Sequence, residues 1–286
     1  MNVITVYEWL NTGNNKDRVI KLLGDKPVHE LAELFSATDS ITCDEAFNKI
    51  TETSNMDELY GQVLLYQENL VLYHGNKDKD MIPLFGRGKR KNDFGQGFYT
   101  TPYEELGKEW AYSSYTDGSI GYLHTYNLNT QGLKILNLMN CDSLVWVAEL
   151  MANRGFKLDR YEDALSIIKE RADKFLSIYK MDTASYDVIV GYRADDKYFR
   201  YVDDFVKGLL YRETLDKALL LGNLGLQVFI KSPKAFSQLT KVSVDIVDKR
   251  YKQLYKDRDD AARQSYEQLK KEHGKTLIFD YIGGTK

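Results

Sequence analysis

The sequence predicts an α+β fold in which short strands and helices alternate irregularly between a helical N-terminal region and a helical C-terminal region. Two observations carry this prediction. Short β-prone runs such as "NLVLY" and "LQVFI" recur through the middle of the chain, whereas apolar residues at helical spacing dominate both ends. Strict strand–helix alternation and a G-x-G-x-x-G turn after a strand are both lacking, which argues against a doubly wound parallel sheet.

Residues 1–67 are predicted to form short helices that turns separate. The run "DRVIKLLGDK" has apolar residues at helical spacing and ends at Gly24, and Pro27 opens "PVHELAELF". The segment "TCDEAFNKI" follows a Thr/Asp/Ser cluster, whose side chains are suited to cap a helix N-terminus. We therefore expect a helical N-terminal region that says little about chemistry.

Residues 68–240 begin with strands. Leu70 to Tyr73 is a short β-prone run that ends at His74 and Gly75, and Phe98 to Thr101 forms a second short run. Pro102 then stands where a helix begins, with Leu106 and Trp110 on one face. Alternation in "SIGYLHTYNLN" predicts a further strand. The residues expected on one side of this strand are Ile120, Tyr122, His124 and Tyr126.

The rest of this middle region mixes helices and strands. We expect "LKILNL", "YDVIVGYRADD" and "LGLQVFIKS" to form strands, the second of them buried. Two helices are expected within residues 143–180, a third over 205–221 in "FVKGLLYRETLDKALLL", and a short one in "SPKAFSQL".

Residues 241–286 are expected to hold a long amphipathic helix over 244–274, ended by Gly274, and a terminal edge strand in "TLIFDYI". The apolar stripe of the helix is Val247, Tyr251, Leu254, Ala262, Tyr266 and Leu269. The chain thus divides into three predicted regions: 1–67, 68–240 and 241–286.

Composition excludes some classes of function. The chain has 286 residues with a formal net charge of −3, which argues against a dedicated non-specific DNA binder with a broad basic field. Cys43 and Cys141 lack metal-like spacing, so we expect no metal site. No basic, apolar leader and no apolar run of about 18 residues is visible. We expect a soluble, cytoplasmic protein with no membrane partner.

The stretch "NDFGQGFYTTP" raises the question of why Phe98 and Tyr99 directly follow Gly95 and Gly97. A hydrophobic core does not need glycines beside its aromatics. A site where a flat ligand lies close to the backbone does need them, because glycine has no side chain to block the ligand. A simple turn is the alternative explanation.

Taken in order, "LYHGN", "DFGQGFYTT" and "LQVFIKSPKAFSQL" resemble the core of ADP-ribosyltransferases of the His-Tyr-Glu type, which include the diphtheria-toxin-like and poly(ADP-ribose) polymerase enzymes. More narrowly, these blocks and "YDVIVGYRADDKYF" resemble a bacterial family of uncharacterised proteins grouped with those enzymes. The resemblance covers residues 68–240 and implies a catalytic domain of short strands in a split sheet, with NAD as co-substrate.

The resemblance also implies roles for individual residues. His74 would hydrogen-bond a ribose hydroxyl, Gly75 would let the backbone approach the nicotinamide amide, and Tyr99 would stack on the nicotinamide ring. The residues expected to contact NAD are Tyr73, His74, Gly75, Arg87, Asp93, Gly95, Gly97, Phe98, Tyr99 and Tyr103. Each also has a structural alternative as a core or turn residue.

The sequence departs from the family pattern at the glutamate, where the best match is Gln227. Glutamine binds a ribose hydroxyl but has no charge to stabilise the developing cation, which argues against poly(ADP-ribose) synthesis. Asp195 and Asp196 are the nearest candidates for a helping carboxylate; a solvated surface loop is the alternative. We therefore expect His74, Tyr99, Gln227, Asp195 and Asp196 to form the catalytic set.

The loop "GRGKRK" contains four cations. They are expected to contact the NAD pyrophosphate or a phosphate-bearing acceptor, because arginine forks match phosphate geometry. A solvated loop is the alternative. The four are Arg87, Lys89, Arg90 and Lys91.

The resemblance implies an NAD-dependent mono-ADP-ribosyltransferase acting on a protein or nucleic-acid acceptor, by analogy a bacterial toxin or a phage-defence effector. An antitoxin or regulatory protein would then bind the helical flanks. The alternatives are a nucleotide-binding module without catalysis, an NAD glycohydrolase, and an interaction protein whose helical flanks do the work.

Overall fold

A computed structural model describes residues 9, 15, 35, 41–53, 69–112, 120–138, 141–154, 165–194, 198–219, 221 and 225–283. The chain divides into two compact units, Met1–Leu70 and Val71–Lys286. In the described residues the second unit is a mixture of helices and two small sheets, so the predicted α+β class is confirmed.

The described part of the first unit contains helix α4 (Cys43–Thr53). Its start is capped reciprocally: the Glu45 amide donates to the Thr42 hydroxyl at 3.1 Å, and the Glu45 carboxylate accepts from the Thr42 amide at 2.9 Å. The Trp9 ring lies 5.4 Å from that of Phe35 and 5.5 Å from that of Phe47. Thr42, directly before "CDEAF", therefore caps the helix, whereas the Thr/Asp/Ser cluster predicted to do so lies outside the described residues.

Three strands form one sheet in the order β1-β3-β7: β1 (Asn69–Asn76), β3 (Gly121–Asn129) and β7 (Leu239–Val247). Strands β3 and β7 are antiparallel, and their register shifts between Thr125, opposite Ser243, and Tyr126, opposite Lys241. Val242 is therefore an extra residue on β7. On the predicted face of β3, His124 and Tyr126 are buried and Tyr122 is half-buried, whereas Ile120 precedes the strand and is 48% exposed.

A second sheet has the order β2-β6-β5-β4. Its strands are β2 (Phe98–Thr100), β6 (Leu226–Ile230), β5 (Val188–Tyr192) and β4 (Ile135–Asn137). The first two pairs are antiparallel and the last is parallel. A β-bridge joins the two sheets: the Tyr73 amide donates to the Thr101 carbonyl at 2.7 Å, and the Thr101 amide donates to the Tyr73 carbonyl at 2.9 Å. This bridge brings the end of β1 beside β2.

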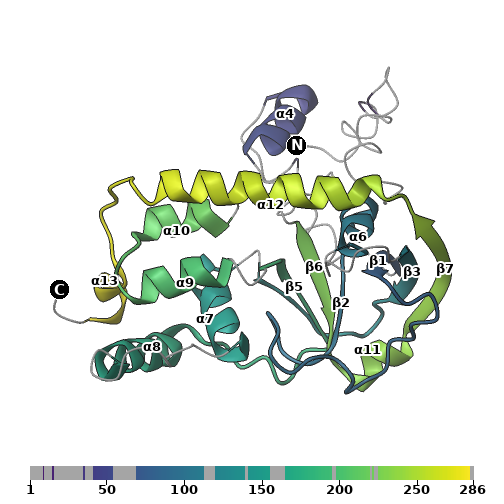
Figure 1. The fold of residues 1–286 in the computed structure, drawn as a ribbon, viewed down its shortest axis with the longest axis horizontal. Coiled ribbons are helices and arrows are strands. Elements are labelled where there is room, and N and C mark those ends of the chain that lie inside the picture. Colours follow the sequence, from purple (N-terminus) through teal and green to yellow (C-terminus); the bar gives the residue numbers. More distant parts are fainter. Residues whose placement is uncertain are drawn as a thin grey trace. The chain divides into compact units, whose positions relative to one another are not determined.

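In the part of the chain that the structure describes, the four-stranded sheet shares one core with five helices that pack beside it and with Tyr266 of the long helix α12 (Arg250–Leu269). Figure 1 shows these helices beside the sheet. Leu136, Ile189 and Phe229 lie opposite one another on β4, β5 and β6, and all three belong to this core. The helices are α7 (Ser143–Arg154), α8 (Leu165–Tyr179), α9 (Tyr198–Val206), α10 (Arg212–Leu219) and α13 (Ile278–Ile282).

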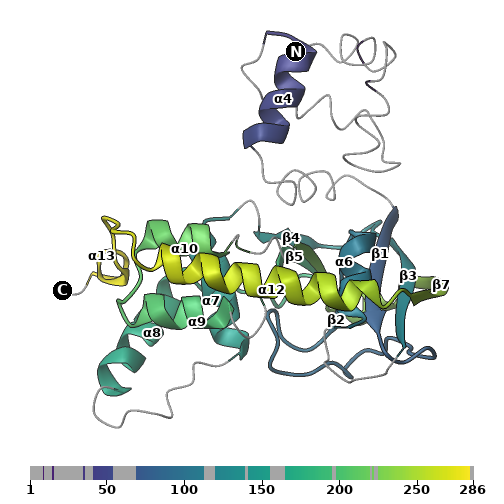
Figure 2. The ribbon, with the colours of Figure 1, turned by 45° about the horizontal axis from the view of Figure 1, so that its top comes forward.

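Helix α12 (Arg250–Leu269) runs from the β7 end of the strand-rich half to the α10 end of the helical half (Figures 1 and 2). At one end Tyr251 packs with Leu123 of β3 and donates its hydroxyl to the Glu105 carboxylate of α6 (Glu104–Trp110) at 2.6 Å. At the other end Tyr266 stacks on Tyr201 at 3.7 Å. The long helix thus fastens α6 to α9.

Three local expectations are wrong. The segment predicted as a terminal strand contains helix α13 (Ile278–Ile282) instead, because the Asp280 carboxylate accepts from the Leu277 amide at 2.8 Å and caps the start of a helix. The long helix begins at Arg250, since residues 244–247 pair with β3, and it ends at Leu269 rather than at Gly274. The predicted helix over 205–221 is broken at Gly208, which has a φ of 75° and lies against the Phe279 ring.

The short helix predicted after β6 is α11 (Pro233–Ser237), which the Ser232 side chain caps. No helix in the described ranges has the length and apolar character that a bilayer span needs. Within the same ranges, no group of three or more His, Cys, Asp or Glu side chains could hold a metal ion.

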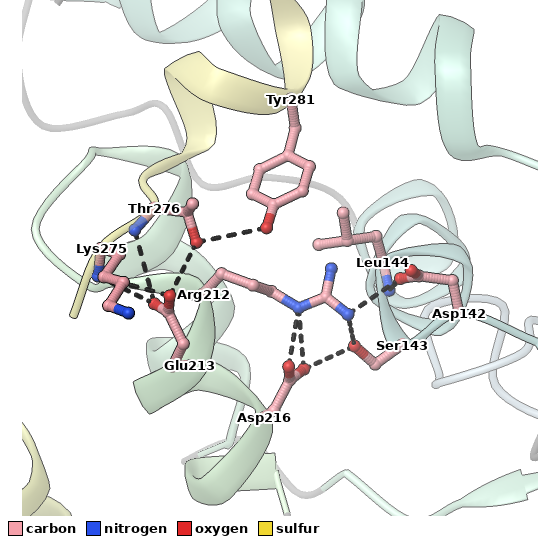
Figure 3. Close-up of polar contacts among 9 residues, drawn as sticks. All are labelled: Asp142, Ser143, Leu144, Arg212, Glu213, Asp216, Lys275, Thr276 and Tyr281. Atoms are coloured by element: carbon pink, nitrogen blue, oxygen red, sulfur yellow. Dashed lines mark hydrogen bonds and ion pairs between the residues drawn. The ribbon is translucent and has the colours of Figure 1, made fainter.

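A polar network holds the start of α7 to α10 (Figure 3). The Arg212 guanidinium donates to the Asp216 carboxylate at 2.8 and 2.9 Å, to Asp142 at 2.9 Å and to the Ser143 hydroxyl at 2.7 Å. The Asp142 carboxylate also accepts from the Leu144 amide at 2.8 Å, so it caps α7. Beside it, Glu213 accepts from the segment that leads into α13 (Figure 3).

Arg212→Ala is expected to lower the free energy of unfolding by about 3 kcal/mol, because it removes several charge-assisted hydrogen bonds from a largely buried side chain. The matched control is Lys217→Ala, since Lys217 is 59% exposed in its pair with Glu272. That control is expected to cost less than about 1 kcal/mol. Urea denaturation measures both, and equal losses would contradict the network's structural role.

Candidate functional site

His74 lies near the end of β1 with both ring nitrogens facing polar groups. Its Nδ1 lies 2.7 Å from the Tyr99 carbonyl oxygen, and its Nε2 lies 3.4 Å from the Asn76 amide nitrogen. A carbonyl only accepts, so Nδ1 carries the hydrogen and Nε2 presents a lone pair. Burial lowers the pKa of His74 to about 4, so the ring is neutral at physiological pH.

Phe98 and Tyr99 point to opposite faces of β2, as successive strand residues must. The Phe98 ring lies 4.8 Å from the His74 ring and 5.3 Å from the Tyr126 ring. The Tyr99 ring instead lies 4.6 Å from Phe229 on the helix-covered face. Phe98 and Tyr99 therefore make separate contacts on opposite faces of β2 and do not form one continuous aromatic surface.

The Tyr99 hydroxyl is held by the loop that precedes β2. It donates to the Gly95 carbonyl at 2.8 Å and accepts from the Phe94 amide at 2.9 Å. Burial, with a further contribution from the nearby Asp93 carboxylate, raises the pKa of Tyr99, so the phenol stays protonated. The loop thus fixes the ring from its polar tip.

Packing accounts for the three glycines that the sequence assigns to ligand contact. A Cβ on Gly75 would lie 2.1 Å from the carbonyl oxygen of Gly107 in α6, and one on Gly97 would lie 2.4 Å from the Phe229 ring. Gly95 has a φ of 92°, a conformation that favours glycine. Gly75 therefore lets α6 approach β1, and Gly97 lets the Phe229 ring of β6 approach the residue before β2. Gly95 lets the loop turn toward the Tyr99 hydroxyl.

Gln227 is buried on β6, and its amide nitrogen donates to the Asp93 carboxylate at 2.7 Å and to the Tyr192 carbonyl at 3.1 Å. Asp93 is itself buried, and its other partners are the Ala194 amide at 2.9 Å and the Arg154 guanidinium at 2.6 Å. Gln227 therefore binds the loop before β2, and its amide nitrogen already donates to two protein groups.

The sequence analysis missed Arg154, which ends α7 and meets Asp93 through Nε at 2.6 Å and Nη2 at 2.5 Å. Its Nη2 also lies 2.5 Å from the Ala194 carbonyl. Burial raises the pKa of Asp93, and Arg154, Gln227 and the Ala194 amide oppose this shift. The only signal for Arg154 in the sequence is a basic residue at a helix C-terminus, which is too common to indicate a site.

Other predicted site residues lie apart from this group. The Tyr73 ring packs against the cluster of Leu123 and Tyr251 beneath α6 and α12, and Tyr103 stands at the N-cap of α6. Arg87 is exposed on the loop between β1 and β2. Asp195 and Asp196 lie outside the described residues.

The structure thus brings the predicted residues into two groups joined by β2. One group is His74 with Phe98, on the side of the three-stranded sheet. The other is Tyr99 with Gln227 and Asp93, linked through Phe229 and the loop before β2.

Comparison with known proteins gives one match. A family described as "Protein of unknown function (DUF3990)" matches residues 70–240, which is more than half of the chain. No curated protein and no solved structure matches.

His74 is expected to make stability depend on pH. Its folded pKa of about 4 lies below the ordinary value of 6.5, so the stabilisation is present above pH 6.5 and is lost as the pH falls toward 4. The difference in unfolding free energy between the wild type and His74→Gln should shrink by up to about 3 kcal/mol over that window. Urea denaturation at several pH values measures it, and a constant difference would contradict the assignment.

Gln227→Glu is expected to destabilise the protein by about 3 kcal/mol, because it replaces an amide donor with a carboxylate against Asp93. Asp93→Asn alone leaves Arg154 without its buried counterion. The double variant Asp93→Asn/Gln227→Glu restores one carboxylate and one amide, and should be more stable than Gln227→Glu by at least about 1 kcal/mol. Additive losses in a urea double-mutant cycle would show that the two side chains do not interact.

Proposed function

We propose, starting from the fact that this chain belongs to the DUF3990 family, that it is an NAD-dependent mono-ADP-ribosyltransferase. The observation that carries the proposal is the pairing of the His74 ring with the Tyr99 carbonyl at 2.7 Å. It joins two of the blocks on which the sequence resemblance rests, "LYHGN" and "DFGQGFYTT", at the junction of the two sheets. The matched residues, 70–240, are also nearly those of the resemblance.

In this proposal His74 binds a ribose hydroxyl of NAD. The Nδ1–H is anchored on a backbone carbonyl, so the neutral Nε2 is the atom that faces a ligand. A ribose hydroxyl would donate to that lone pair, beside or in place of the Asn76 amide. A fixed tautomer favours such a role because no proton has to move before binding.

Tyr99 supplies the second contact. Phe94 and Phe229 pack against its ring, which nevertheless stays partly exposed, and its hydroxyl is tied to the loop before β2. The nicotinamide ring would stack on the exposed part of the phenol ring, with offset or tilted geometry. Because Asp93 and Gln227 hold the loop that holds Tyr99, these two residues position the ring.

The reaction breaks the bond between the nicotinamide nitrogen and the ribose carbon. The electron pair of that bond leaves with nicotinamide, and a nucleophile of the acceptor forms a new bond to the same carbon and gives up its proton. Positive charge develops on the ribose in between, so the site must bind that state more strongly than NAD itself.

A second candidate is a nucleotide-binding module without transfer. Gln227 favours it, because this side chain is 3% exposed, has no charge and donates to Asp93 rather than facing solvent. In that case His74 and Tyr99 would hold NAD or a related nucleotide, and no bond would break.

The test is nicotinamide release from NAD labelled in its adenylate half, with and without cell lysate. We expect lysate-dependent release and label on a macromolecule, and His74→Ala should lower both at least tenfold while leaving the fold intact. The matched control is His273→Ala, an exposed histidine beside Tyr211 that should leave activity unchanged.

Other results would decide against transfer. Release without labelled macromolecule would identify a glycohydrolase, and NAD binding by calorimetry without release would identify the binding module. Equal activity in His74→Ala and the wild type would exclude His74 from the reaction.

A further inference from the structure

The loop between β1 and β2 carries a compact group of cations. Four basic residues lie within five positions, all of them exposed, and none of them is paired with a carboxylate in the part of the chain that the structure describes. The chain as a whole has a net charge of −3, so this positive charge is local. We call these residues, Arg87, Lys89, Arg90 and Lys91, the cationic loop.

Contacts of Gly86 and Gly88 with residues just before β2 fix the start of the cationic loop. The Gln96 amide donates to the carbonyls of Gly86 at 2.6 Å and Gly88 at 2.9 Å. Gly88 also lies so close to the Gly97 backbone that a Cβ would be 2.3 Å from its carbonyl oxygen. Since Gly97 directly precedes β2, the four cations are presented next to the strand that carries Tyr99.

Apolar side chains beside the cations are exposed as well. Phe85 is 57% exposed, with one edge of its ring on Phe236 of α11 at 5.9 Å, and Ile82 and Leu84 are 68% and 45% exposed. An aromatic face next to unpaired cations is the combination that binds single-stranded nucleic acid, because bases stack on the ring and phosphates take the cations. The acidic residues of the same loop lie elsewhere: Asp78 and Asp80 stand before Ile82, and Asp93 is buried and paired with Arg154.

We propose that the cationic loop and Phe85 form a binding surface for single-stranded nucleic acid beside the candidate site. Four like charges held close together without counterions repel one another, and a polyanion relieves that repulsion while it releases condensed ions. If the proposed transfer of ADP-ribose holds, this surface makes a nucleic acid the acceptor. The binding itself does not depend on transfer.

The test is fluorescence anisotropy with labelled single-stranded RNA and DNA over a series of salt concentrations, in the absence of NAD. Replacing all four cations with Gln should reduce the slope of log affinity against log salt by up to about 3. Phe85→Ala should weaken binding by roughly tenfold and leave that slope unchanged. The matched control replaces four scattered exposed lysines, Lys169, Lys174, Lys249 and Lys271, with Gln and should retain most of the affinity.

Three results would overturn the proposal. Equal affinity for polyglutamate would show a surface that reads charge alone, and stronger binding to phosphatidylserine vesicles would show a membrane-directed loop. A fourfold-Gln variant that binds the oligonucleotides as the wild type does but binds NAD more weakly would place the cations on the NAD pyrophosphate. Because these arms need no turnover, failure here is distinct from failure of the proposed transfer.

Discussion

The arrangement of the candidate site depends on one buried carboxylate, that of Asp93. A carboxylate removed from water is costly unless donors surround it, and here Arg154, the Gln227 amide and the Ala194 amide do so. These donors come from the end of α7, from β6 and from the segment after β5. One side chain therefore ties the loop before β2 to three separate parts of the second unit.

This anchoring reaches Tyr99 through the backbone. Phe94 and Gly95 follow Asp93 directly, and their amide and carbonyl hold the Tyr99 hydroxyl. Meanwhile the Tyr99 carbonyl holds His74 from the other side of the strand. Strand β2 is thus held from both sheets. Because residue 227 lies against the Asp93 carboxylate, its charge affects how well this strand is held. An amide suits a neighbouring carboxylate, whereas a glutamate would oppose it.

Charge in this protein is organised locally. Among the ion pairs with a buried carboxylate, those of Asp93 with Arg154 and of Glu149 with Lys180 stabilise α7 and its surroundings. The exposed cations before β2 are not compensated within the described residues. The small net charge of the chain therefore does not reveal the positive surface next to the strand that carries Tyr99. The positions of the basic residues along the sequence do indicate it.

By itself the sequence determined the elements whose signals are local. Strands β5 and β6 are buried apolar runs and α11 follows a Ser-Pro cap, as expected, whereas β1 continues past His74 to Asn76. The face of β3 that the sequence predicts to be buried is buried only at His124 and Tyr126. The prediction of a terminal strand was wrong, because a short apolar run fits a strand or a buried helix equally well. In the structure this run packs as helix α13.

Only the tertiary structure decided how the site is assembled. Asp93 meets Arg154 across 61 positions and Gln227 across 134, and no periodicity or motif reports contacts at such separations. The glycines beside Phe98 and Tyr99 likewise have their reason in β6 and in the Tyr99 hydroxyl, not in their own neighbours along the chain. Local patterns record which face a side chain prefers, whereas the partner that satisfies a buried charge is chosen only when distant segments pack together.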